Sequence, residues 1–482
     1  MTSLQPAVPE PCSTGSETTW TSTAEPAGSG LRRPVRPAAR LAALSLGVAL
    51  VQLDVSIVNV GLDQMRGLMA DGVAGLQWVV NGYTLAFAGL LLTGGALGDR
   101  FGAKRLYLLG LALFTLASLA CGLAPSGTAL IAARVLQGIG AALLMPPSLA
   151  LVVHAYRDPS ERAKAIGVWG SVGGLAMVAG PVLGGLLIAL FGWRSIFLIN
   201  LPVGLLALWM ALRFTEETTE RHVRAIDLPG QILGILTVVA LTAAIIEGEP
   251  LGWSHPAILG AIAVFLLAGA LFLAVESRTA EPMMPLSLFR NPIFTAAALI
   301  GTLLNVSFYG AIFLLSLYFQ DGLGMSPLSA GLAFLPMTGL IAITNIMSGR
   351  VAVRWGNRLP IVLGLAIDTF GFVALALQLR GDAGYAHIWW PLLLIGFGMA
   401  LAVPAMIGAL LATVEKTRAG IASGVLNALR QTGGAVGVAV FGVIGAGGSS
   451  LSGMSTAMWV AAFGLLIALL LGALCIKRMP TS

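Results

Sequence analysis

Charged residues are scarce in this chain: Asp, Glu, Lys and Arg make up 10% of its 482 residues. Soluble domains carry about 25%, so these charges are too few to cover the outside of a water-soluble fold of this length. Apolar residues make up 57% of the chain instead. Because lipid tails solvate apolar side chains directly, the composition predicts a membrane-spanning protein.

Cysteine is also scarce: Cys12 lies in a polar segment, and Cys121 and Cys475 lie in apolar runs. We interpret the last two as small buried side chains, so the sequence has no disulfide framework. It contains no GxxxxGK[ST], no HExxH and no paired Cys/His cluster, and it has four histidines, in or near expected loops. We therefore expect no ATP site, no metal, no cofactor and no enzymatic activity.

Long apolar runs dominate the rest of the chain. The first 40 residues are rich in Pro, Ser, Thr and Gly and are expected to form a disordered tail. The next run is longer than a signal-peptide core and precedes no cleavage pattern, so we expect it to remain as the first span. Runs of roughly 20 apolar residues predict an all-α fold of fourteen membrane helices. Their expected ranges are 41–62, 76–98, 105–124, 128–153, 164–190, 193–213, 228–247, 256–275, 293–319, 327–348, 359–379, 388–413, 419–445 and 456–476.

The positive charges give the orientation. With the amino terminus inside, most Lys and Arg residues fall in the inside segments, whereas Arg66, Arg194 and Arg380 fall outside. A missed helix would move every later loop to the other side, so the bias favours an even number of spans and two cytoplasmic termini. The net charge of +6 is spread over short loops and therefore does not indicate nucleic acid.

A repeat divides the chain. GALGDRFGAKR begins at Gly95 and GRVAVRWGNRL begins at Gly349, each after a helix that runs inward. Parallel repeats of this kind are typical of transporters with two halves. We therefore expect a cytoplasmic tail over 1–40, a six-helix bundle over 41–215, a linker with two extra helices over 216–290, and a second six-helix bundle over 291–478.

Several motifs carry a resemblance to a known family. The loop GALGDRFGAKR is followed by LIAARVLQGIGAA at 130–142 and GPVLGG at 180–185. LDVSIVNVGL lies at 53–62, GWRSIFLINLPVG at 192–204, and RAGIASGVLNALRQTGGAVGVAV at 418–440. Together these resemble the fourteen-spanner drug:proton antiporters of the major facilitator superfamily, such as actinobacterial exporters of the methylenomycin-resistance type. The resemblance covers about 40–478 and implies the major facilitator fold and proton-coupled drug efflux.

The resemblance implies that the turn after the second helix acts as a latch, a contact that holds the cytoplasmic side closed. We expect this turn to be two to six residues long. Asp99 is expected near the amino terminus of the thirteenth helix, around 420–424, where the helix dipole stabilises an acid. Val353 replaces the acid in the second copy, so the latch is asymmetric. For Lys104 and Arg105 the alternative is a purely topological role. The latch motif comprises Gly95, Asp99, Arg100, Gly102, Lys104 and Arg105.

Four charges are expected inside the membrane, where each needs a partner or water. Asp54 and Arg134 are predicted at similar depths, roughly 12 and 9 Å from the outer surface, on helices that line the central cavity in this family. We interpret them as a protonation-linked pair, with a static structural ion pair as the alternative. Asp368 and Arg430 also share a depth, which predicts a second pair, favoured as structural.

Small and polar residues suggest the helix faces that line the transport path. Gly173, Ala176, Gly180 and Gly184 share one face of the fifth helix, which we interpret as a sliding surface between the halves, with ordinary helix packing as the alternative. With Pro181 and Gly185 they form the antiporter-type motif. Polar candidates for the substrate cavity are Asn81, Tyr83, Gln137, Asn305, Tyr309, Asn427 and Gln431.

The sequence therefore predicts proton-coupled efflux of hydrophobic drugs by alternating access in the plasma membrane. The expected partners are a small hydrophobic or amphiphilic substrate, protons and the bilayer, and a monomer suffices. The alternatives are export of a specific metabolite (an amino acid, an osmolyte or the host's own secondary metabolite) and a non-transporting membrane sensor.

Overall fold

The computed structural model describes residues 37–156, 158–217, 227–379, 384–415, 418–445 and 451–476. Within these ranges every regular element is a helix, and fourteen segments are long and apolar enough to cross a membrane. The predicted number of spans is thereby confirmed. The tail expected over 1–40 lies outside the described residues as far as residue 36, and the first helix already begins at Pro37.

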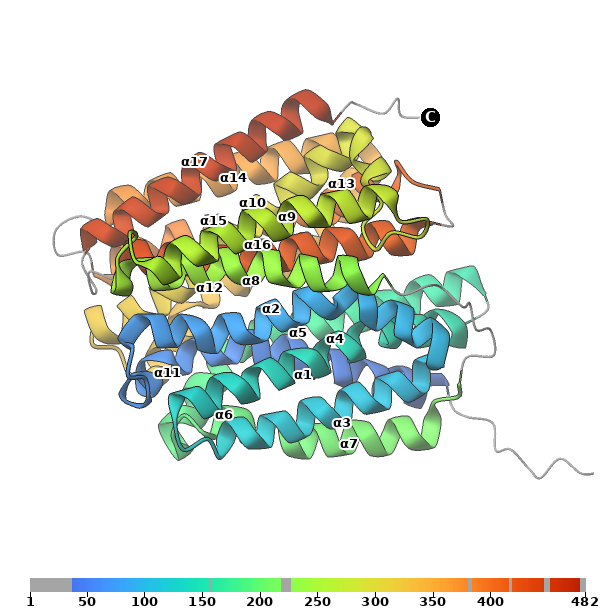
Figure 1. Ribbon diagram of the computed structural model, residues 1–482, viewed down its shortest axis with the longest axis horizontal. Helices are drawn as coiled ribbons and strands as arrows, with labels where there is room; N and C mark the ends of the chain where they lie inside the picture. Colours follow the sequence, from blue (N-terminus) through green and yellow to red (C-terminus); the bar gives the residue numbers. More distant parts are fainter. Residues whose placement is uncertain are drawn as a thin grey trace, which may run out of the picture. The chain divides into compact units, whose positions relative to one another are not determined.

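The helices run along a common direction (Figure 1). Four of the fourteen spans carry more than one label: two continue from an α-helix into η1 or η3, and two are interrupted. The elements are α1 Pro37–Met65, η1 Arg66–Leu68, α2 Gly72–Phe101, α3 Ala103–Gly122, α4 Gly127–Ala155, α5 Pro159–Phe191, α6 Ser195–Leu198, α7 Asn200–Phe214, α8 Leu228–Leu251, α9 Pro256–Arg278, η2 Leu286–Arg290, α10 Pro292–Leu317, η3 Tyr318–Gly322, α11 Pro327–Ala333, α12 Leu335–Thr338, α13 Ile341–Trp355, α14 Arg358–Gln378, α15 Tyr385–Leu411, α16 Ala419–Gly445 and α17 Leu451–Cys475.

Local sequence signals fix where several helices begin. Asp158 accepts hydrogen bonds from the amides of Ser160 and Glu161 at 2.9 Å and caps α5. Ser126 caps α4 in the same way, and Asn291 caps α10. These side chains satisfy amides that have no partner within the helix.

Proline interrupts two spans. Pro202 has no amide hydrogen to donate to the carbonyl four residues earlier, and the sixth span is broken at Ile199 into α6 and α7. Pro336 lies where the tenth span is broken into α11, α12 and α13. Asn200, the residue that follows the first break, is fully buried.

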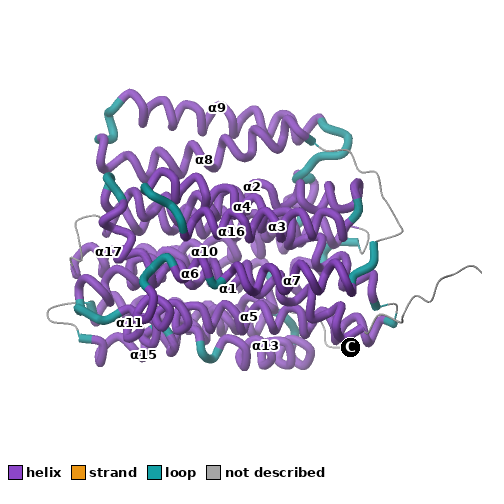
Figure 2. The backbone as a smooth tube through the Cα atoms, turned by 90° about the horizontal axis from the view of Figure 1, so that it is seen from below, coloured by secondary structure: helices purple, strands orange, loops and turns teal. Residues whose placement is uncertain are grey.

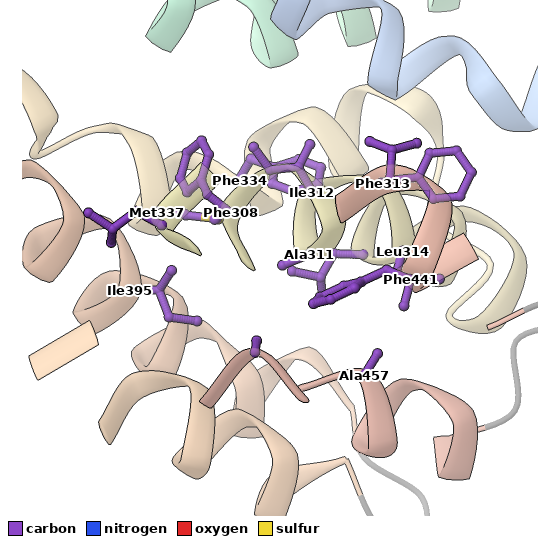
Figure 3. Packing of buried hydrophobic residues seen from close by; sticks show 14 of the residues in the cluster. Phe308, Ala311, Ile312, Phe313, Leu314, Phe334, Met337, Ile395, Phe441 and Ala457 are labelled. Carbon is purple, nitrogen blue, oxygen red and sulfur yellow. The ribbon is translucent and has the colours of Figure 1, made fainter. Parts of the chain in front are cut away.

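Helices α1–α7 pack mainly on one another, and so do α10–α17 (Figures 1 and 2). We call these sets the first and the second bundle. One apolar cluster, around Tyr107 and Phe114, draws all its buried members from the first bundle. A larger cluster includes much of the second bundle, and its members include Phe308 and Phe313 of α10 and Phe441 of α16 (Figure 3).

The extra helices α8 and α9 form a hairpin that packs on the outside of the bundles. Helix α8 contacts α2 of the first bundle and α16 of the second, and α9 packs on α8 (Figure 2). Trp78 of α2 donates a hydrogen bond to Glu247 of α8 at 2.7 Å. Thr93 and Gln231 are also hydrogen-bonded, so polar contacts tie both ends of α8 to the first bundle.

The sequence repeat is also a structural repeat. Gly102 ends α2 with φ +102° and Gly356 ends α13 with φ +80°. Both values lie in the region that favours glycine. Helices α3 and α14 begin directly after these turns, so the two copies form matching connections at the same end of the helices.

Candidate functional site

A buried ion pair lies at the centre of the first bundle. Arg134 Nη1 of α4 lies 2.5 Å from Asp54 Oδ2 of α1. Asp54 is 0% exposed and Arg134 is 1% exposed. A buried arginine with no counter-charge would be costly, and so would a lone carboxylate, so each group depends on the other. The prediction that these two charges meet is confirmed in the structure.

Neutral side chains complete the coordination of the Asp54 carboxylate. Gln137 Nε2 donates to Asp54 Oδ1 at 2.8 Å, and Asn200 Nδ2 donates to the same oxygen at 3.2 Å. Ser118 accepts hydrogen bonds from both amides, at 3.2 and 3.0 Å, and donates to the Phe197 carbonyl at 2.9 Å. The ion pair is therefore the centre of a buried polar network that joins α1, α3, α4 and α7.

The guanidinium group of Arg134 is held on several sides. Its Nε donates to the Val79 carbonyl at 3.1 Å, and Nη1 donates to Gln137 Oε1 at 2.8 Å. Its carbon Cζ lies 4.3 Å from the centre of the Tyr83 ring, within the range of a cation–π contact. These contacts place one charged group where it faces both the network and the space between the bundles.

A small cavity lies between the two bundles and touches this network. Its volume is about 20 Å³, enough for about one water molecule and too small for a drug. Arg134 and Tyr83 line it from the first bundle, and Tyr309 and Gln431 line it from the second. The remaining lining residues are Val55, Val58, Asn59, Val80, Thr84, Gly434 and Val438.

Three of the seven predicted cavity residues line this cavity: Tyr83, Tyr309 and Gln431. The other four do not. Gln137 belongs to the Asp54 network, and Asn305 donates to the backbone carbonyl of Arg430 at 2.8 Å. Asn81 is fully buried, and neither of its side-chain polar atoms has a hydrogen-bond partner among the described residues, whereas Asn427 is exposed. Helical spacing indicates which polar residues share a face of a helix. It does not indicate which helix packs against that face.

An ion pair and hydrogen bonds join the two bundles at the end that carries residues 66–71 and 318–326. We call it the outer end because the positive charges predict that these segments lie outside. Arg66 Nη1 lies 3.2 Å from Asp321 Oδ2. Gln320 Nε2 donates to the Val60 carbonyl at 2.9 Å, and Gln77 Nε2 donates to the Val438 carbonyl at 2.9 Å. These bonds join η1, α1 and α2 to η3 and α16, so the outer end is closed.

The opposite end, which carries the turns at Gly102 and Gly356, is looser around α5. A Cβ atom added to Gly167, Gly170 or Gly174 would meet no atom within 4 Å. Near the outer end of the same helix, a Cβ on Gly185 would lie 2.5 Å from the Pro327 carbonyl oxygen of α11. The contacts of α5 with the second bundle are therefore tight at the outer end and absent at these three inner glycines.

Comparison with known proteins identifies the chain. Residues 44–438 match the Major Facilitator Superfamily. The chain belongs to this superfamily. It is 39% identical over 420 residues to the methylenomycin A resistance protein of Streptomyces coelicolor, covering 86% of this chain and 87% of that protein. It is also 39% identical over 406 residues to the multidrug resistance protein Stp of Mycobacterium tuberculosis, covering 84% and 75%.

Solved structures agree on the fold. A bacterial homologue of the human lysosomal transporter Spinster, in an inward-facing and unoccupied conformation, matches with a TM-score of 0.67 at 17% identity, over 93% of this chain and 100% of that one. A POT family transporter in complex with 5-aminolevulinic acid matches with a TM-score of 0.68 at 13% identity, over 91% and 96%. With its fourteen spans, this major facilitator chain is a multi-pass membrane protein.

The latch loop of this major facilitator protein is shorter than expected. Helix α2 continues through Asp99 and Arg100 to Phe101, and α3 already includes Lys104 and Arg105, so Gly102 alone forms the turn. The expected turn of two to six residues was wrong because the positive φ of Gly102 reverses the chain in one step. Asp99 and Arg100 are exposed, while Gly95, one turn before Asp99, lies near Pro146 of α4.

The second part of the motif contacts the segment after α7 in its own bundle. The Glu217 carboxylate accepts hydrogen bonds from the amides of Lys104 at 2.9 Å and Arg105 at 3.3 Å, which caps α3. Lys104 Nζ donates to the Thr215 carbonyl at 2.6 Å. Besides the topological role predicted for it, Lys104 therefore has a structural role.

Removing this cap should destabilise the protein measurably. We expect Glu217→Ala to cost about 1 kcal/mol and to lower the thermal unfolding midpoint in detergent. Glu216→Ala is the matched control, because the Glu216 side chain is 56% exposed and pairs with Arg40 at the surface. Equal midpoints for the two variants would contradict the capping role.

The glycine face of α5 packs within one bundle. A Cβ on Gly173 would meet Val48, and one on Gly180 or Gly184 would meet Ile57, all on α1. The sliding surface predicted for this face was therefore misplaced. The contact with the second bundle is made instead by Gly185 and by Pro181, whose carbonyl oxygen meets Gly331 of α11.

The second predicted ion pair was wrong. Among the described residues, neither Asp368 nor Arg430 forms an ion pair. Asp368 of α14 lies against Gly398 of α15, whereas the Arg430 side chain lies against Gly301 of α10. The two residues share a depth but point to different neighbours.

Proposed function

We propose that this major facilitator protein exports hydrophobic or amphiphilic drugs and antibiotics across the plasma membrane in exchange for protons, by alternating access. One observation carries the proposal: the Asp54–Arg134 pair is fully buried, yet Arg134 also lines the cavity between the bundles. A titratable acid is thereby linked to the surface that a substrate would contact. The relatives named for resistance to methylenomycin A and for multidrug resistance support the same activity.

The geometry supports a mechanism in which protonation controls the pair. In the outer-closed conformer, the Asp54 carboxylate accepts hydrogen bonds from Arg134, Gln137 and Asn200. A proton on Asp54 would remove the charge that neutralises Arg134. The uncompensated Arg134 then favours a conformer in which water or substrate reaches it.

The two ends of the protein would open in turn. The outer contacts between Arg66 and Asp321 and between Gln320 and Val60 must break when the protein faces outward. In that state the Asp99 turn would close the inner end as a latch at the start of α16. Leu92, on the same helix as Asp99, lies against Gly424, since a Cβ there would be 2.5 Å from Leu92 Cδ2.

The proposal also covers the domain boundaries, the membrane orientation and the number of chains that transport requires. We propose that the tail and six-helix bundles have the boundaries expected from the sequence, that both termini are cytoplasmic, and that one copy of the chain suffices for transport. The excess of Lys and Arg at the inner end supports this orientation. Protons and a small apolar or amphiphilic molecule are the transported species.

Dye efflux from cells that lack their own exporters tests the proposal. Cells that express the protein should extrude a preloaded amphiphilic dye when energised, and an uncoupler of the proton gradient should stop this extrusion. Extrusion that continues undiminished with the uncoupler would contradict proton coupling. No extrusion of any dye in a chemically diverse panel would favour a specific metabolite as the substrate and would contradict export of many drugs.

A further inference from the structure

One intramembrane cation has no counter-charge among the residues that the structure describes. Arg134 is neutralised by Asp54. Arg430 of α16 forms no ion pair with any described residue, and its Nε has no hydrogen-bond partner there. A lone cation inside an apolar span costs several kcal/mol unless water or an anion solvates it, so Arg430 calls for a ligand outside the chain.

The Arg430 side chain packs against α10 of the second bundle. Its Cγ would lie 3.0 Å from a Cβ on Gly301 of α10, and Met406 of α15 borders the same glycine. Asn305 of α10 fixes the Arg430 backbone with a hydrogen bond of 2.8 Å to its carbonyl oxygen. The side chain is only half-buried, so its terminal nitrogens reach space that the protein does not fill.

The neighbouring residues belong to the cavity wall. Gln431 follows Arg430 and lines the cavity, as does Gly434 one turn along α16. A Cβ on Gly434 would lie 3.0 Å from the ring of Tyr309, which lines the cavity from α10. The second bundle thus offers a phenol and an amide on the cavity wall, with the Arg430 cation at the adjacent position of α16.

No described acid inside the membrane is placed to neutralise this cation. Asp368 packs against Gly398 on α15, and its Oδ1 has no hydrogen-bond partner among the described residues. The Asp54 carboxylate is already occupied by Arg134, Gln137 and Asn200. The counter-charge for Arg430 must therefore come from outside the described residues.

We propose that Arg430 binds the anionic group of an amphiphilic substrate, a singly charged carboxylate above all, and so sets the substrate class of the exporter. The proposal rests on the export function and narrows it. A guanidinium donates two parallel hydrogen bonds to a carboxylate, and the apolar wall suits the rest of an amphiphile. Substrates with one acidic group should therefore be preferred over neutral or cationic molecules of the same shape.

Three pyrene probes test this preference directly. They are 4-(1-pyrenyl)butanoate, its methyl ester and 1-pyrenemethylammonium, which share a fluorescent apolar body and differ in charge. Binding is measured by fluorescence with the full-length protein in nanodiscs of phosphatidylcholine, which carries no net charge. We expect wild type to bind the anion at least about tenfold more tightly than the ester, because the bond is charge-assisted, and the ammonium probe more weakly than either.

Variants at one position separate recognition from packing. Arg430→Gln should raise the Kd of the anion about tenfold or more and leave the Kd of the ester within about threefold, while Arg430→Lys should recover part of the anion preference. Wild type that binds the anion no better than the ester would overturn the proposal. So would equal loss of all three probes in Arg430→Gln, which would mean that Arg430 only maintains the fold.

Two further measurements distinguish a substrate site from a lipid site, and anion binding from export. If one fifth of the lipid is replaced by phosphatidylglycerol and anion binding is lost, the site belongs to a lipid headgroup and the substrate proposal is overturned. Unchanged anion binding supports the substrate proposal.

Energised efflux of the ester from cells tests export separately. Ester efflux without anion preference would overturn the Arg430 assignment while export stands, whereas anion preference without energised efflux of any probe would support Arg430 and contradict export.

Discussion

Asp54→Asn is expected to abolish energised efflux, with a fall of about 100-fold or more in the rate of uphill dye extrusion. Asparagine has the shape of aspartate but carries no titratable proton, so proton entry can no longer drive the change between conformers. Exchange of dye down its own gradient should persist, because Asp54 is not among the residues that line the cavity. The measurement compares uphill efflux with dye counterflow in everted membrane vesicles.

A double variant separates coupling from stability. Asp54→Asn alone leaves Arg134 buried without its counter-charge, which costs about 3–5 kcal/mol. Asp54→Asn with Arg134→Gln removes both charges and should regain much of that stability while uphill efflux stays absent. Uphill efflux at the wild-type rate in either variant would mean that the pair is only a structural ion pair.

Covalent closure of the outer end is expected to stop transport almost completely. Arg66 and Asp321 lie on different bundles and pair at 3.2 Å. With Cys12, Cys121 and Cys475 replaced, Arg66→Cys and Asp321→Cys provide two thiols for a short bis-methanethiosulfonate reagent. Because the outer end must open once in each cycle, the cross-linked protein should lose nearly all efflux and regain it on reduction.

The same region offers a matched control for the cross-link. Asp63 also pairs with Arg66, at 3.5 Å, and lies one turn away on α1 of the same bundle. A link between Asp63→Cys and Arg66→Cys modifies the same surface but joins nothing that has to separate. We expect this protein to keep its efflux. Full transport by the protein linked between bundles would contradict alternating access.

Hydropathy and charge predicted the fold well because each membrane span is a local property. A run of about 20 apolar residues has few alternatives to a membrane helix, and fourteen were found as expected. The details depended on single residues. Gly102 shortened the latch turn, and the breaks near Pro202 and Pro336 divided two spans that the hydropathy had joined.

The site was predicted in part, because the depth of a residue is only one of its coordinates. Depth brought Asp54 and Arg134 together correctly and paired Asp368 with Arg430 wrongly. Whether two residues at the same depth form a pair also depends on the direction in which each side chain points around its helix. It depends further on which helices are neighbours. Ser118 and Asn200 were missed for the same reason, although Asn200 is a polar residue in the middle of an apolar span.

The glycines of α5 show a related limit. The spacing of Gly173, Gly180 and Gly184 correctly indicated a face that another helix approaches closely. It did not indicate that the helix is α1 of the same bundle. Gly185, the next residue along, faces the other bundle instead, so one position changes the inferred role from packing to contact between moving parts.

The exchange of substrate for protons is tested most directly by proton movement in proteoliposomes. A dye without a titratable group is added outside vesicles that contain the protein and a trapped pH indicator. As dye enters down its gradient through wild-type protein, protons should leave and the lumen should become alkaline, whereas Asp54→Asn should carry dye without a pH change. Dye entry through wild-type protein with no change in luminal pH would contradict proton-coupled export.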